Sequence, residues 1–399
     1  MIPMPLNSNQ ISYIMGDADI VRSMEGISSF QPFDDHVIDY LDRVSKIILS
    51  DSKSKKYSDV ITFAFWCRRA SIKSLQKRYA DNMNLIGRGV VFHITPSNVA
   101  VNFAYSLAVG MVSGNANIVR LPSKDFEQVR IICNALQKAL DNNIERYICL
   151  VRYGHNQDIT DYLSLICDTR IVWGGDQTIA AIRKSPLKPR ATEIAFADRY
   201  SICVINADAY LRARNKKTIA QGFLNDTYLT DQNACTSPRL VVWMGANINE
   251  AQDVFWIELH GLLIEQYILQ PIQVVSKYAS LCKQAAAGQS VHLTNGKDNY
   301  IVRVKVDALT RSLMEHKGNS GYFMEYNAES LDELLPLCIS QCQTLSYYGL
   351  EIDKIRDFVI ASRPRGIDRV VPIGKTMEFS LVWDGYDLIR SLSRELTIN

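Results

Sequence analysis

Short apolar segments alternate with helical segments from about residue 87 to residue 206, and this alternation constrains the fold more than any other feature of the chain. Val90–Ile94 and Ala116–Arg120 have the composition of buried strands, and residues 100–112 between them have helical spacing of apolar side chains. Further strands are predicted at residues 147–151, 170–173 and 202–206, with a helix before each of the first two. Strands and helices in this order form the doubly wound parallel sheet typical of nucleotide-binding domains, so we predict an α/β fold.

A second α/β region follows, and the 399 residues are enough for two or three domains. Strands are expected at residues 240–243, 300–306 and 322–326, and helices at residues 210–223 and 250–269. We therefore expect a helical segment at residues 1–80 that packs on a cofactor domain at 81–206, closed by the strand at 202–206. A catalytic domain at 207–375 and a C-terminal tail at 376–399 complete this prediction.

The charge balance and the apolar segments exclude several classes of protein. A net charge of +2 supplies no overall field for nucleic acid or an anionic membrane. The most apolar stretch, residues 103–112, is too short to span a bilayer, which needs about 20 residues. The first residues lack the pattern of a signal peptide, and the nine cysteines show no paired spacing. These features predict a cytoplasmic protein without disulfides.

Common catalytic and metal-binding motifs are missing. The chain has no Gly-x-Gly-x-x-Gly, no Walker loop, no Gly-x-Ser-x-Gly elbow and no zinc spacing, so no metal is expected. Cys338 and Cys342 are four residues apart on what reads as an apolar helix, which favours buried thiols. His93, inside an apolar strand, is interpreted as a hydrogen-bonded core residue.

Cys235 differs from most of the other cysteines. Cys133, Cys149, Cys167 and Cys203 have apolar neighbours, whereas Cys235 stands in the polar sequence Asp-Gln-Asn-Ala-Cys-Thr-Ser-Pro. A loop of small and polar residues can expose a thiolate and surround it with backbone N–H donors. The alternative is an ordinary loop cysteine.

Four segments, in order along the chain, resemble the lux-type fatty-acyl reductases, the acyl-CoA reductase branch of the aldehyde dehydrogenase superfamily. The likeness runs from about residue 60 to the C-terminus, and the segments are residues 92–103, 114–124, 231–238 and 383–387. The resemblance implies that a cysteine attacks an activated acyl group, that NADPH reduces the thioacyl-enzyme, and that an aldehyde leaves. Cys235 would be the nucleophile, and the side chain of Asn98 would support the developing oxyanion together with the Cys235 amide. For Asn98, the alternative is a turn-capping asparagine.

The resemblance also implies positions that bind the cofactor. Arg120 corresponds to a strand-end lysine of the superfamily, and Ser123 and Lys124 to the residue that discriminates NAD from NADP. A hydroxyl and a cation at that place favour the extra phosphate of NADP. The alternative for Ser123 and Lys124 is a helix N-cap followed by a surface lysine.

Two turns complete the implied cofactor site. Gly174 and Gly175 resemble the Gly-Ser turn that passes under the pyrophosphate, where small residues let the backbone approach. Thr95 and Pro96 belong to the turn that also carries Asn98, and are predicted to bind the cofactor. A segment at residues 365–374 resembles the rim of the active site, with no role for a single residue.

Glu193 lies approximately where aldehyde dehydrogenases carry the base that activates water, but the residues after it depart from the family pattern. An acyl reductase has no need to hydrolyse its thioacyl intermediate. Glu193 is therefore a candidate for proton transfer or for an ion pair with Arg190 or Arg199.

Two other readings compete with an NADPH-dependent acyl reductase: an oxidising aldehyde dehydrogenase, and an inactive scaffold with the same fold. The resemblance leaves the acyl donor open between CoA and an acyl-protein. It implies an acyl-activating synthetase as a partner, and a homo-oligomer is the general expectation.

Overall fold

The structure is a computed structural model that describes residues 9–79, 84–289, 291–294 and 298–398. The chain divides into two compact units, which are treated separately below. The first unit combines residues 1–197 with residues 380–399, and the second unit is formed by residues 198–379.

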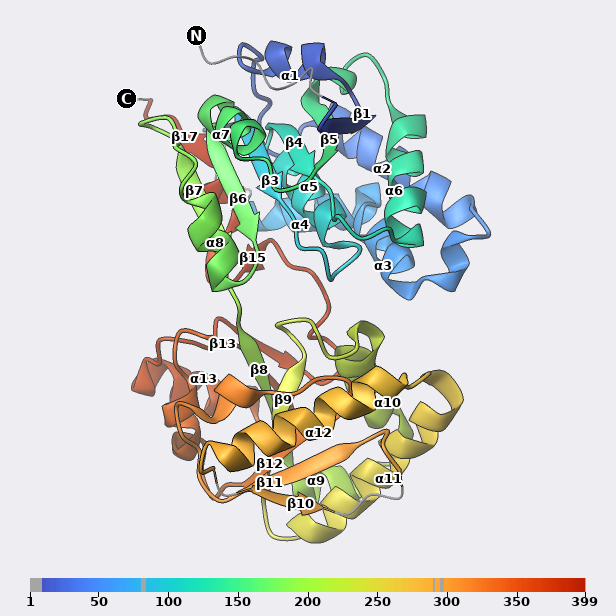
Figure 1. The fold of residues 1–399 in the computed structure, drawn as a ribbon, viewed down its shortest axis with the longest axis vertical. Helices are drawn as coiled ribbons and strands as arrows, with labels where there is room; N and C mark the ends of the chain where they lie inside the picture. The colour runs from blue at the N-terminus through green and yellow to red at the C-terminus, as the bar shows by residue number, and fades with distance from the viewer. Residues whose placement is uncertain (1–8, 80–83, 290, 295–297, 399) are drawn as a thin grey trace. The chain divides into compact units, whose positions relative to one another are not determined.

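The first unit begins with a strand and a group of helices and continues as alternating strands and helices (Figure 1). Its elements are β1 (Ile11–Met15), α1 (Ala18–Met24), α2 (Asp35–Ser50), α3 (Ser58–Trp66), α4 (Arg69–Gln76), β2 (Leu85–Gly87), β3 (Val90–Ile94), α5 (Asn102–Val112), β4 (Ala116–Arg120), α6 (Glu127–Ala139), β5 (Ile148–Tyr153), α7 (Gln157–Ile166), β6 (Thr169–Trp173), α8 (Asp176–Ile182), β7 (Thr192–Phe196), β15 (Val382–Trp383), β16 (Tyr386–Asp387), α14 (Leu388–Ser391) and β17 (Ser393–Glu395).

The main sheet of this unit has the order β1-β5-β4-β3-β6-β7. Strands β5, β4, β3, β6 and β7 are parallel, and β1 pairs antiparallel with β5 at one edge. The order in the sheet reverses between β3 and β6, because the chain first moves outward to β5 and then returns to the other side. A parallel sheet of this kind opens a binding crevice at the carboxyl ends of the two strands that flank the reversal. The predicted doubly wound sheet is confirmed.

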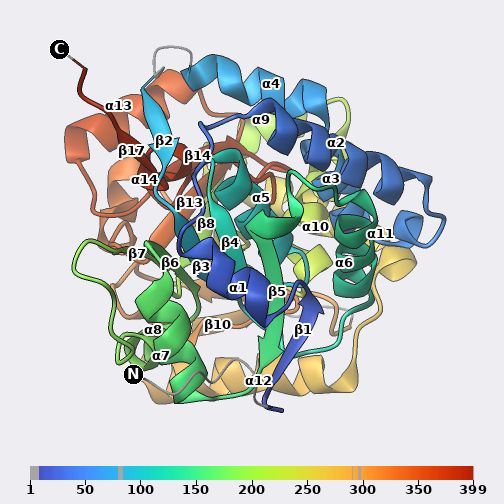
Figure 2. The ribbon, with the colours of Figure 1, turned by 90° about the horizontal axis from the view of Figure 1, so that it is seen from above.

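Both faces of this sheet are covered, which explains why its strands read as continuous apolar segments rather than as alternating ones. Every residue of β3 and β6 is buried. Side chains of α1, α7 and α8 pack on one face in a single apolar cluster. Figure 2 shows β3, β4 and β5 side by side, with α1 against them.

Two parts of the expected domain organisation differ from the structure. The strand predicted at 202–206 does not close the first sheet: it is β8 (Tyr200–Asn206), which pairs with β9 and β13 in the second unit. The residues after 379 belong to the first unit, where β17 pairs antiparallel with β2. Both pairings join segments far apart in sequence, and a buried apolar strand carries no local mark of the sheet it will enter.

The second unit is also an α/β unit with a largely parallel sheet. Its elements after β8 are α9 (Ala207–Arg212), α10 (Lys216–Thr227), the 3-10 turn η5 (Tyr228–Thr230), β9 (Pro238–Met244), α11 (Ile248–Gln266), α12 (Pro271–Ala286), β10 (Val291–Thr294), β11 (Val302–Val306), η6 (Leu313–His316), β12 (Tyr322–Asn327), η7 (Leu331–Leu337), β13 (Cys342–Tyr348), α13 (Ile352–Ser362) and β14 (Arg369–Pro372). The sheet order is β10-β11-β12-β9-β8-β13-β14, and only β10 is antiparallel to its neighbour.

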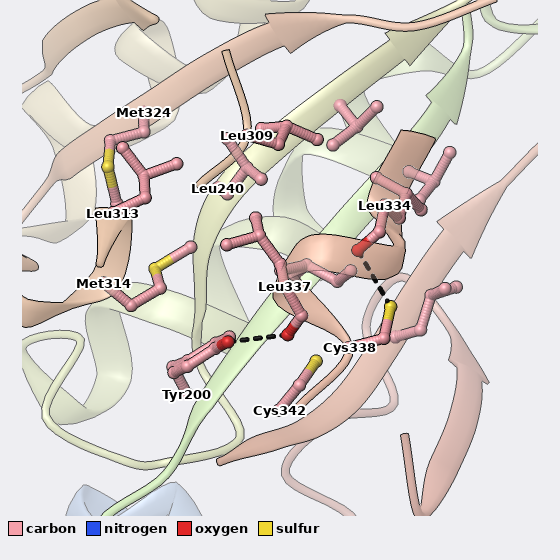
Figure 3. Packing of buried hydrophobic residues seen from close by; sticks show 14 of the residues in the cluster. Tyr200, Leu240, Leu309, Leu313, Met314, Met324, Leu334, Leu337, Cys338 and Cys342 are labelled. Atoms are coloured by element: carbon pink, nitrogen blue, oxygen red, sulfur yellow. Dashed lines mark hydrogen bonds between the residues drawn. The ribbon is translucent and has the colours of Figure 1, made fainter. Parts of the chain in front are cut away.

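Successive residues of β9 alternate between two apolar cores. Leu240 and Val242 belong to a core that also contains η7 and α13, while Val241 and Trp243 belong to a core with α9, α10 and α11. Figure 3 shows the first of these cores, where the Tyr200 hydroxyl donates to the Leu337 carbonyl at 2.6 Å. The second unit therefore also has helices on both faces of its sheet.

Cys338 and Cys342 are buried as predicted, but not on one helix. Cys338 follows the short turn η7, with its thiol against the Leu334 carbonyl at 3.1 Å, and Cys342 is the first residue of β13 (Figure 3). Pro336 interrupts this region, and the helical spacing of the apolar residues does not extend beyond the turn.

Candidate active site

Thr95 and Pro96 follow β3 directly and lie at the carboxyl edge of the first sheet, beside the point where the strand order reverses. Both are half-buried. The Thr95 hydroxyl donates to the Arg120 carbonyl at 2.7 Å, which joins the turn after β3 to the end of β4. The structure therefore brings these predicted cofactor residues to one edge.

Arg120 is directed toward the neighbouring strand. Its Nη2 donates to the Gly154 carbonyl at 3.0 Å, and its guanidinium lies 4.5 Å from the centre of the Tyr153 ring. These contacts stabilise the end of β5. They also occupy donors that a phosphate would otherwise use.

Ser123 and Lys124 are exposed after β4, as a phosphate-binding pair requires. The Lys124 ammonium lies 5.0 Å from the centre of the Phe126 ring, and α6 begins only at Glu127. The adjacent Asp125 carboxylate lies 3.6 Å from Arg130. The helix cap proposed for Ser123 is not the one observed, because Phe126 occupies the cap position of α6.

Gly174 and Gly175 follow β6, on the other side of the reversal in strand order. A side chain at Gly175 would meet no described atom within 4 Å, so the surface above it is open. Asp176 begins α8, a helix of seven residues, and places a carboxylate beside this turn. The ring of Trp173, the last residue of β6, stacks on the Phe196 ring with the two centres 3.8 Å apart, and Tyr386 packs edge-on against Phe196.

Tyr386 explains part of the resembling segment at residues 383–387. Asp384 and Gly385 have positive φ values of 49° and 79°, as a tight hairpin between β15 and β16 requires. This hairpin carries Tyr386 to the ring of Phe196. The aromatic group Trp173, Phe196 and Tyr386 was missed by sequence reasoning, because its members come from distant strands.

Asn98 is exposed in the loop between β3 and α5. It belongs to the first unit, whereas Cys235 belongs to the second. The loop is consistent with a side chain that acts on a ligand, and it is also consistent with the turn residue considered as the alternative.

Glu193 is an ion-pair residue in the structure. One carboxylate oxygen accepts from Arg170 at 2.6 and 2.9 Å and the other accepts from Arg183 at 2.7 Å, so its partners are neither Arg190 nor Arg199. Burial acts to raise the pKa of Glu193, but the hydrogen bonds and charges of Arg183 and Arg170 outweigh it and lower the pKa below its ordinary value. Glu193 is the second residue of β7, opposite Arg170, and does not lie at the carboxyl edge with Gly174.

Cys235 lies in the second unit, in the loop between η5 and β9, and is half-exposed. Burial raises the pKa of the thiols of Cys133, Cys149, Cys167, Cys203 and Cys338 to about 12. The expectation that these cysteines are shielded is confirmed. Cys282 on α12 is exposed as well, so exposure alone does not single out Cys235.

Gln232 holds the loop that carries Cys235. Its Oε1 accepts from the backbone N–H groups of Gly321 and Tyr322 at 3.0 and 3.2 Å. Its Nε2 donates to the carbonyls of Pro238 and Tyr322 at 2.8 and 3.2 Å. The side chain is completely buried, and it joins the loop to the amino ends of β9 and β12. The sequence analysis did not identify Gln232. Its position three residues before Cys235 was the one feature that could have suggested a role in holding the loop.

The same loop contains backbone strain that these contacts stabilise. Asp231 and Gln232 have φ values of 50° and 58°, in the left-handed region that costs L-residues about 1–2 kcal/mol each. The Asp231 carboxylate accepts from the Tyr267 hydroxyl at 2.6 Å, and the Cys235 carbonyl accepts from the Ser201 hydroxyl at 2.7 Å. The thiol is thus carried on a firmly held segment rather than on a mobile one.

His93 is confirmed as a core residue. It is fully buried, with Nδ1 2.8 Å from the Ser106 hydroxyl and Nε2 3.0 Å from Asn117 Oδ1, and burial lowers its pKa to about 4. In the described part of the chain, no three His, Cys, Asp or Glu side chains are grouped to hold a metal ion. Nor does that part contain a helix with the length and apolar character needed to cross a membrane.

Comparison with known proteins identifies a family to which this chain is similar. Residues 20–286 match the family model of the acyl-CoA reductases, LuxC. A long-chain acyl-protein thioester reductase of Photorhabdus laumondii is 23% identical over 331 residues, covering 78% of this chain and 63% of that protein. One of the same description from Aliivibrio fischeri is 26% identical over 165 residues, covering 40% of this chain and 33% of that protein. The chain thus spans between one third and two thirds of these relatives.

Solved structures with the same fold are aldehyde dehydrogenases. An NAD-dependent benzaldehyde dehydrogenase from Corynebacterium glutamicum has a TM-score of 0.66 at 13% identity, with 98% of this chain and 94% of that chain covered. A lactaldehyde dehydrogenase from Escherichia coli has a TM-score of 0.64 at 11% identity, with 95% and 88% covered. The aldehyde-dehydrogenase-like fold is confirmed. Since the family match extends over more than half of its residues, this chain belongs to the LuxC family of acyl-CoA reductases.

Proposed function

We propose that this protein reduces an activated fatty acyl group, presented as a thioester, to the aldehyde. The observation that carries the proposal is the half-exposed thiol of Cys235 on a loop clamped by Gln232, in a chain of the LuxC family. The relatives described as long-chain acyl-protein thioester reductases support the same reaction class.

The Cys235 thiolate would attack the acyl carbonyl carbon, and the thiol of the donor would leave with a proton, which gives a thioacyl-enzyme. Oxyanion stabilisation would come from backbone N–H groups of the loop and from Asn98. Reduction of the thioacyl carbon then releases the aldehyde and regenerates the thiolate. The hydrogen-bonded loop would keep the sulfur in one position, which would save reorganisation in each step.

A bound reduced nicotinamide would supply the hydride. The carboxyl edge of the first sheet fits such a group: Gly175 leaves open space and Ser123 and Lys124 are exposed. Lys124 and Ser123 would hold the additional phosphate of NADPH, because a cation and a hydroxyl attract it whereas a carboxylate would repel it. Thr95, Pro96 and Gly174 would line the remainder of the site, with Arg120 stabilising the adjacent strand end.

The acyl donor is either acyl-CoA, as the family description has it, or an acyl-protein, as the names of the relatives have it. An acyl-activating synthetase as a partner, and a homo-oligomeric state, remain predictions. Light scattering of the purified protein, alone and mixed with an acylated synthetase, tests both.

The test of the reaction is a scan of acyl-CoAs of increasing chain length and of an acylated protein, each with NADPH and with NADH. Loss of the reduced nicotinamide together with trapped aldehyde is the expected result, and NADPH is expected to be preferred. Formation of acid from aldehyde and NAD, with no reduction of any acyl thioester, would instead identify an oxidising dehydrogenase. If neither activity is found with any of the acyl donors, the protein is an inactive scaffold with the same fold.

Cys235→Ala is expected to lower kcat by about 10⁴-fold or more, since the covalent route is lost. Without the nicotinamide, mass spectrometry of the parent protein should find the acyl group on the peptide that contains Cys235. Cys282→Ala, which removes the other exposed thiol, is the matched control and should retain full activity. An active Cys235→Ala protein would exclude the proposed intermediate.

A further inference from the structure

Asp226 is a buried carboxylate that the proposed reaction does not use directly. It is the second-to-last residue of α10, and only 1% of it is exposed. Its Oδ2 accepts from the backbone N–H of Gly374 at 2.6 Å, and its Oδ1 accepts from the backbone N–H of Thr376 at 3.0 Å. Each carboxylate oxygen therefore holds one N–H group of the turn at residues 374–377, which follows β14 and is called the 374–377 turn below.

Further contacts fit the 374–377 turn closely to α10. Gly374 has a φ of 88°, and a Cβ added to it would lie 3.1 Å from the Cα of Gly222 on α10. The guanidinium of Arg369 on β14 donates to three carbonyls of this segment at 2.7, 2.9 and 2.6 Å, those of Thr376, Lys375 and Glu378. Arg369 thus holds carbonyl groups of this segment while Asp226 holds N–H groups of the turn.

The 374–377 turn also contacts the loop that carries Cys235. The hydroxyl of Thr236, the residue after Cys235, donates to the sulfur of Met377 at 3.2 Å. Thr236 is buried, and Met377 is half-buried. A thioether is a weak acceptor on a flexible side chain, so this contact depends on where the turn places Met377. A continuous series of contacts within the second unit thus leads from Asp226 through the turn to Thr236.

Holding both N–H groups firmly requires the ionised form of Asp226. A carboxylate accepts at both oxygens, whereas a protonated carboxyl group carries an O–H donor on one of them, and its hydrogen bonds are about half as strong. Burial raises the pKa of Asp226 to about 6, and the hydrogen bonds from Gly374 and Thr376 oppose this effect only in part. The carboxylate is therefore present above about pH 6 and is lost as the pH falls through that value.

Charged and titratable groups of neighbouring elements surround Asp226. The charge of Arg369 on β14 acts to lower the pKa of Asp226. Lys375 and Glu378 of the segment after β14 pair with each other. Cys203 of β8 stays a neutral thiol, because burial raises its pKa to about 12. Among these groups, Asp226 is the one that changes charge near pH 6.

We propose that Asp226 is a positioning residue for Cys235: its carboxylate holds the 374–377 turn, and Met377 of that turn supports the loop of the nucleophile. The inference deepens the proposed function and rests on Cys235 as its nucleophile. Gln232 joins the loop to β9 and β12, and the turn joins the same loop to α10 and β14. Acidification through about pH 6 weakens this second support and leaves the first.

The test is amide hydrogen exchange of the full chain without ligands, read by mass spectrometry of two peptides. One peptide contains Gly374 and Thr376, and the other contains residues 231–237 of the Cys235 loop. Asp226→Asn keeps the size of the side chain and replaces one acceptor oxygen by an amide nitrogen that only donates. At about pH 7.5 it should speed exchange of the turn peptide by about tenfold and of the loop peptide by about threefold. The ratio of variant to parent should approach one at about pH 5, where the parent carboxyl group is also neutral.

Two further variants separate positioning from a general loss of structure. Met377→Ala removes the contact with Thr236, so it should speed exchange of the loop peptide and leave the turn peptide protected. Asp353→Asn removes an exposed carboxylate from α13 of the same unit, where it pairs with Arg356, and should change neither peptide. With substrate, Asp226→Asn should lower kcat by about tenfold at nearly unchanged KM, because the nucleophile is displaced while substrate binding is kept.

The parent protein can overturn the proposal by itself, so the test holds even if Asp226→Asn fails to fold. Equal protection of the turn amides above and below about pH 6, after correction for intrinsic exchange, would show that the carboxylate does not hold the turn. A loop peptide that neither Asp226→Asn nor Met377→Ala affects would also overturn it. Failure of the proposed function is a separate result. Coupled exchange of the turn and the loop in a protein that forms no acyl-enzyme would retain the support by Asp226 and reject the reaction.

Discussion

Each unit has a largely parallel sheet, and the two sheets carry their candidate functional residues at opposite ends of their strands. In the first unit, Thr95 and Gly174 follow β3 and β6 at the carboxyl edge, where the order of the strands reverses. In the second unit, Cys235 precedes β9 and lies at the amino edge. The general rule for ligand sites in open α/β sheets describes the first unit and not the second.

The two edges also differ in how firmly their loops are held. Ser97 and Asn98 are exposed in the loop between β3 and α5. The Cys235 loop is joined to β9 and β12 by the four hydrogen bonds of Gln232. The difference suits the two tasks, because a cofactor must enter and leave, whereas a nucleophile must remain in place between one attack and the next. Three substitutions test this contrast, in order of expected effect.

Asn98→Ala tests the open edge. If Asn98 donates to the oxyanion, kcat should fall by about 10²–10³-fold, which corresponds to about 3–4 kcal/mol. The free energy of unfolding should change by less than about 0.5 kcal/mol, because the side chain is exposed. Steady-state kinetics and urea unfolding give the two values, with Ser97→Ala as the neighbouring exposed control. Parent-like kcat would leave Asn98 as a turn residue.

Gln232→Leu tests the firmly held edge. The substitution removes four buried hydrogen bonds, each worth about 0.5–1 kcal/mol, so the free energy of unfolding should fall by about 3 kcal/mol. Alkylation of Cys235 should also lose its single-exponential course, as the loop samples several conformations. Gln221→Leu is the control, since its amide donates to a half-buried partner on α10 and to an exposed one on α11. Unchanged stability and unchanged alkylation kinetics would show that Gln232 does not hold the Cys235 loop.

Glu193→Gln tests whether the ion pair with Arg170 stabilises the first unit. Loss of the charge weakens the pair with the buried Arg170, which should cost about 2 kcal/mol of stability and leave kcat near that of the parent. The pKa of Glu193 is lowered in the folded protein, so its contribution is present above the ordinary glutamate pKa of about 4.3 and is lost as pH falls through the folded value. Unfolding from about pH 7 to about pH 3 should show the parent and the variant converging.

The exposed pair of Glu127 with Arg130 supplies the control for this series, and Glu127→Gln should change stability by less than about 1 kcal/mol. A large loss of kcat in Glu193→Gln at unchanged stability would instead restore proton transfer as the role of Glu193.

Local sequence was sufficient for much of the fold. The apolar segments of β3, β4 and β6 and the helix α5 were predicted within two residues of their observed bounds, because buried strands and helices differ in period over a few residues. The polar neighbours of Cys235 correctly separated it from the thiols inside strands, although Cys282 was not distinguished as exposed. The helix α12 was not predicted.

What the amino-acid sequence determined by itself is many of the helices and strands, the doubly wound character of the first sheet and the burial of most cysteines. Tertiary structure alone decided that β8 enters the second sheet, that β17 returns to β2, and that Glu193 meets Arg170 and Arg183. It also decided that Gln232 forms hydrogen bonds with Tyr322, which is 90 residues away in the sequence. The physical reason is that period and composition act over one helix or strand, whereas hydrogen-bond partners and counter-ions are chosen only when distant segments pack together.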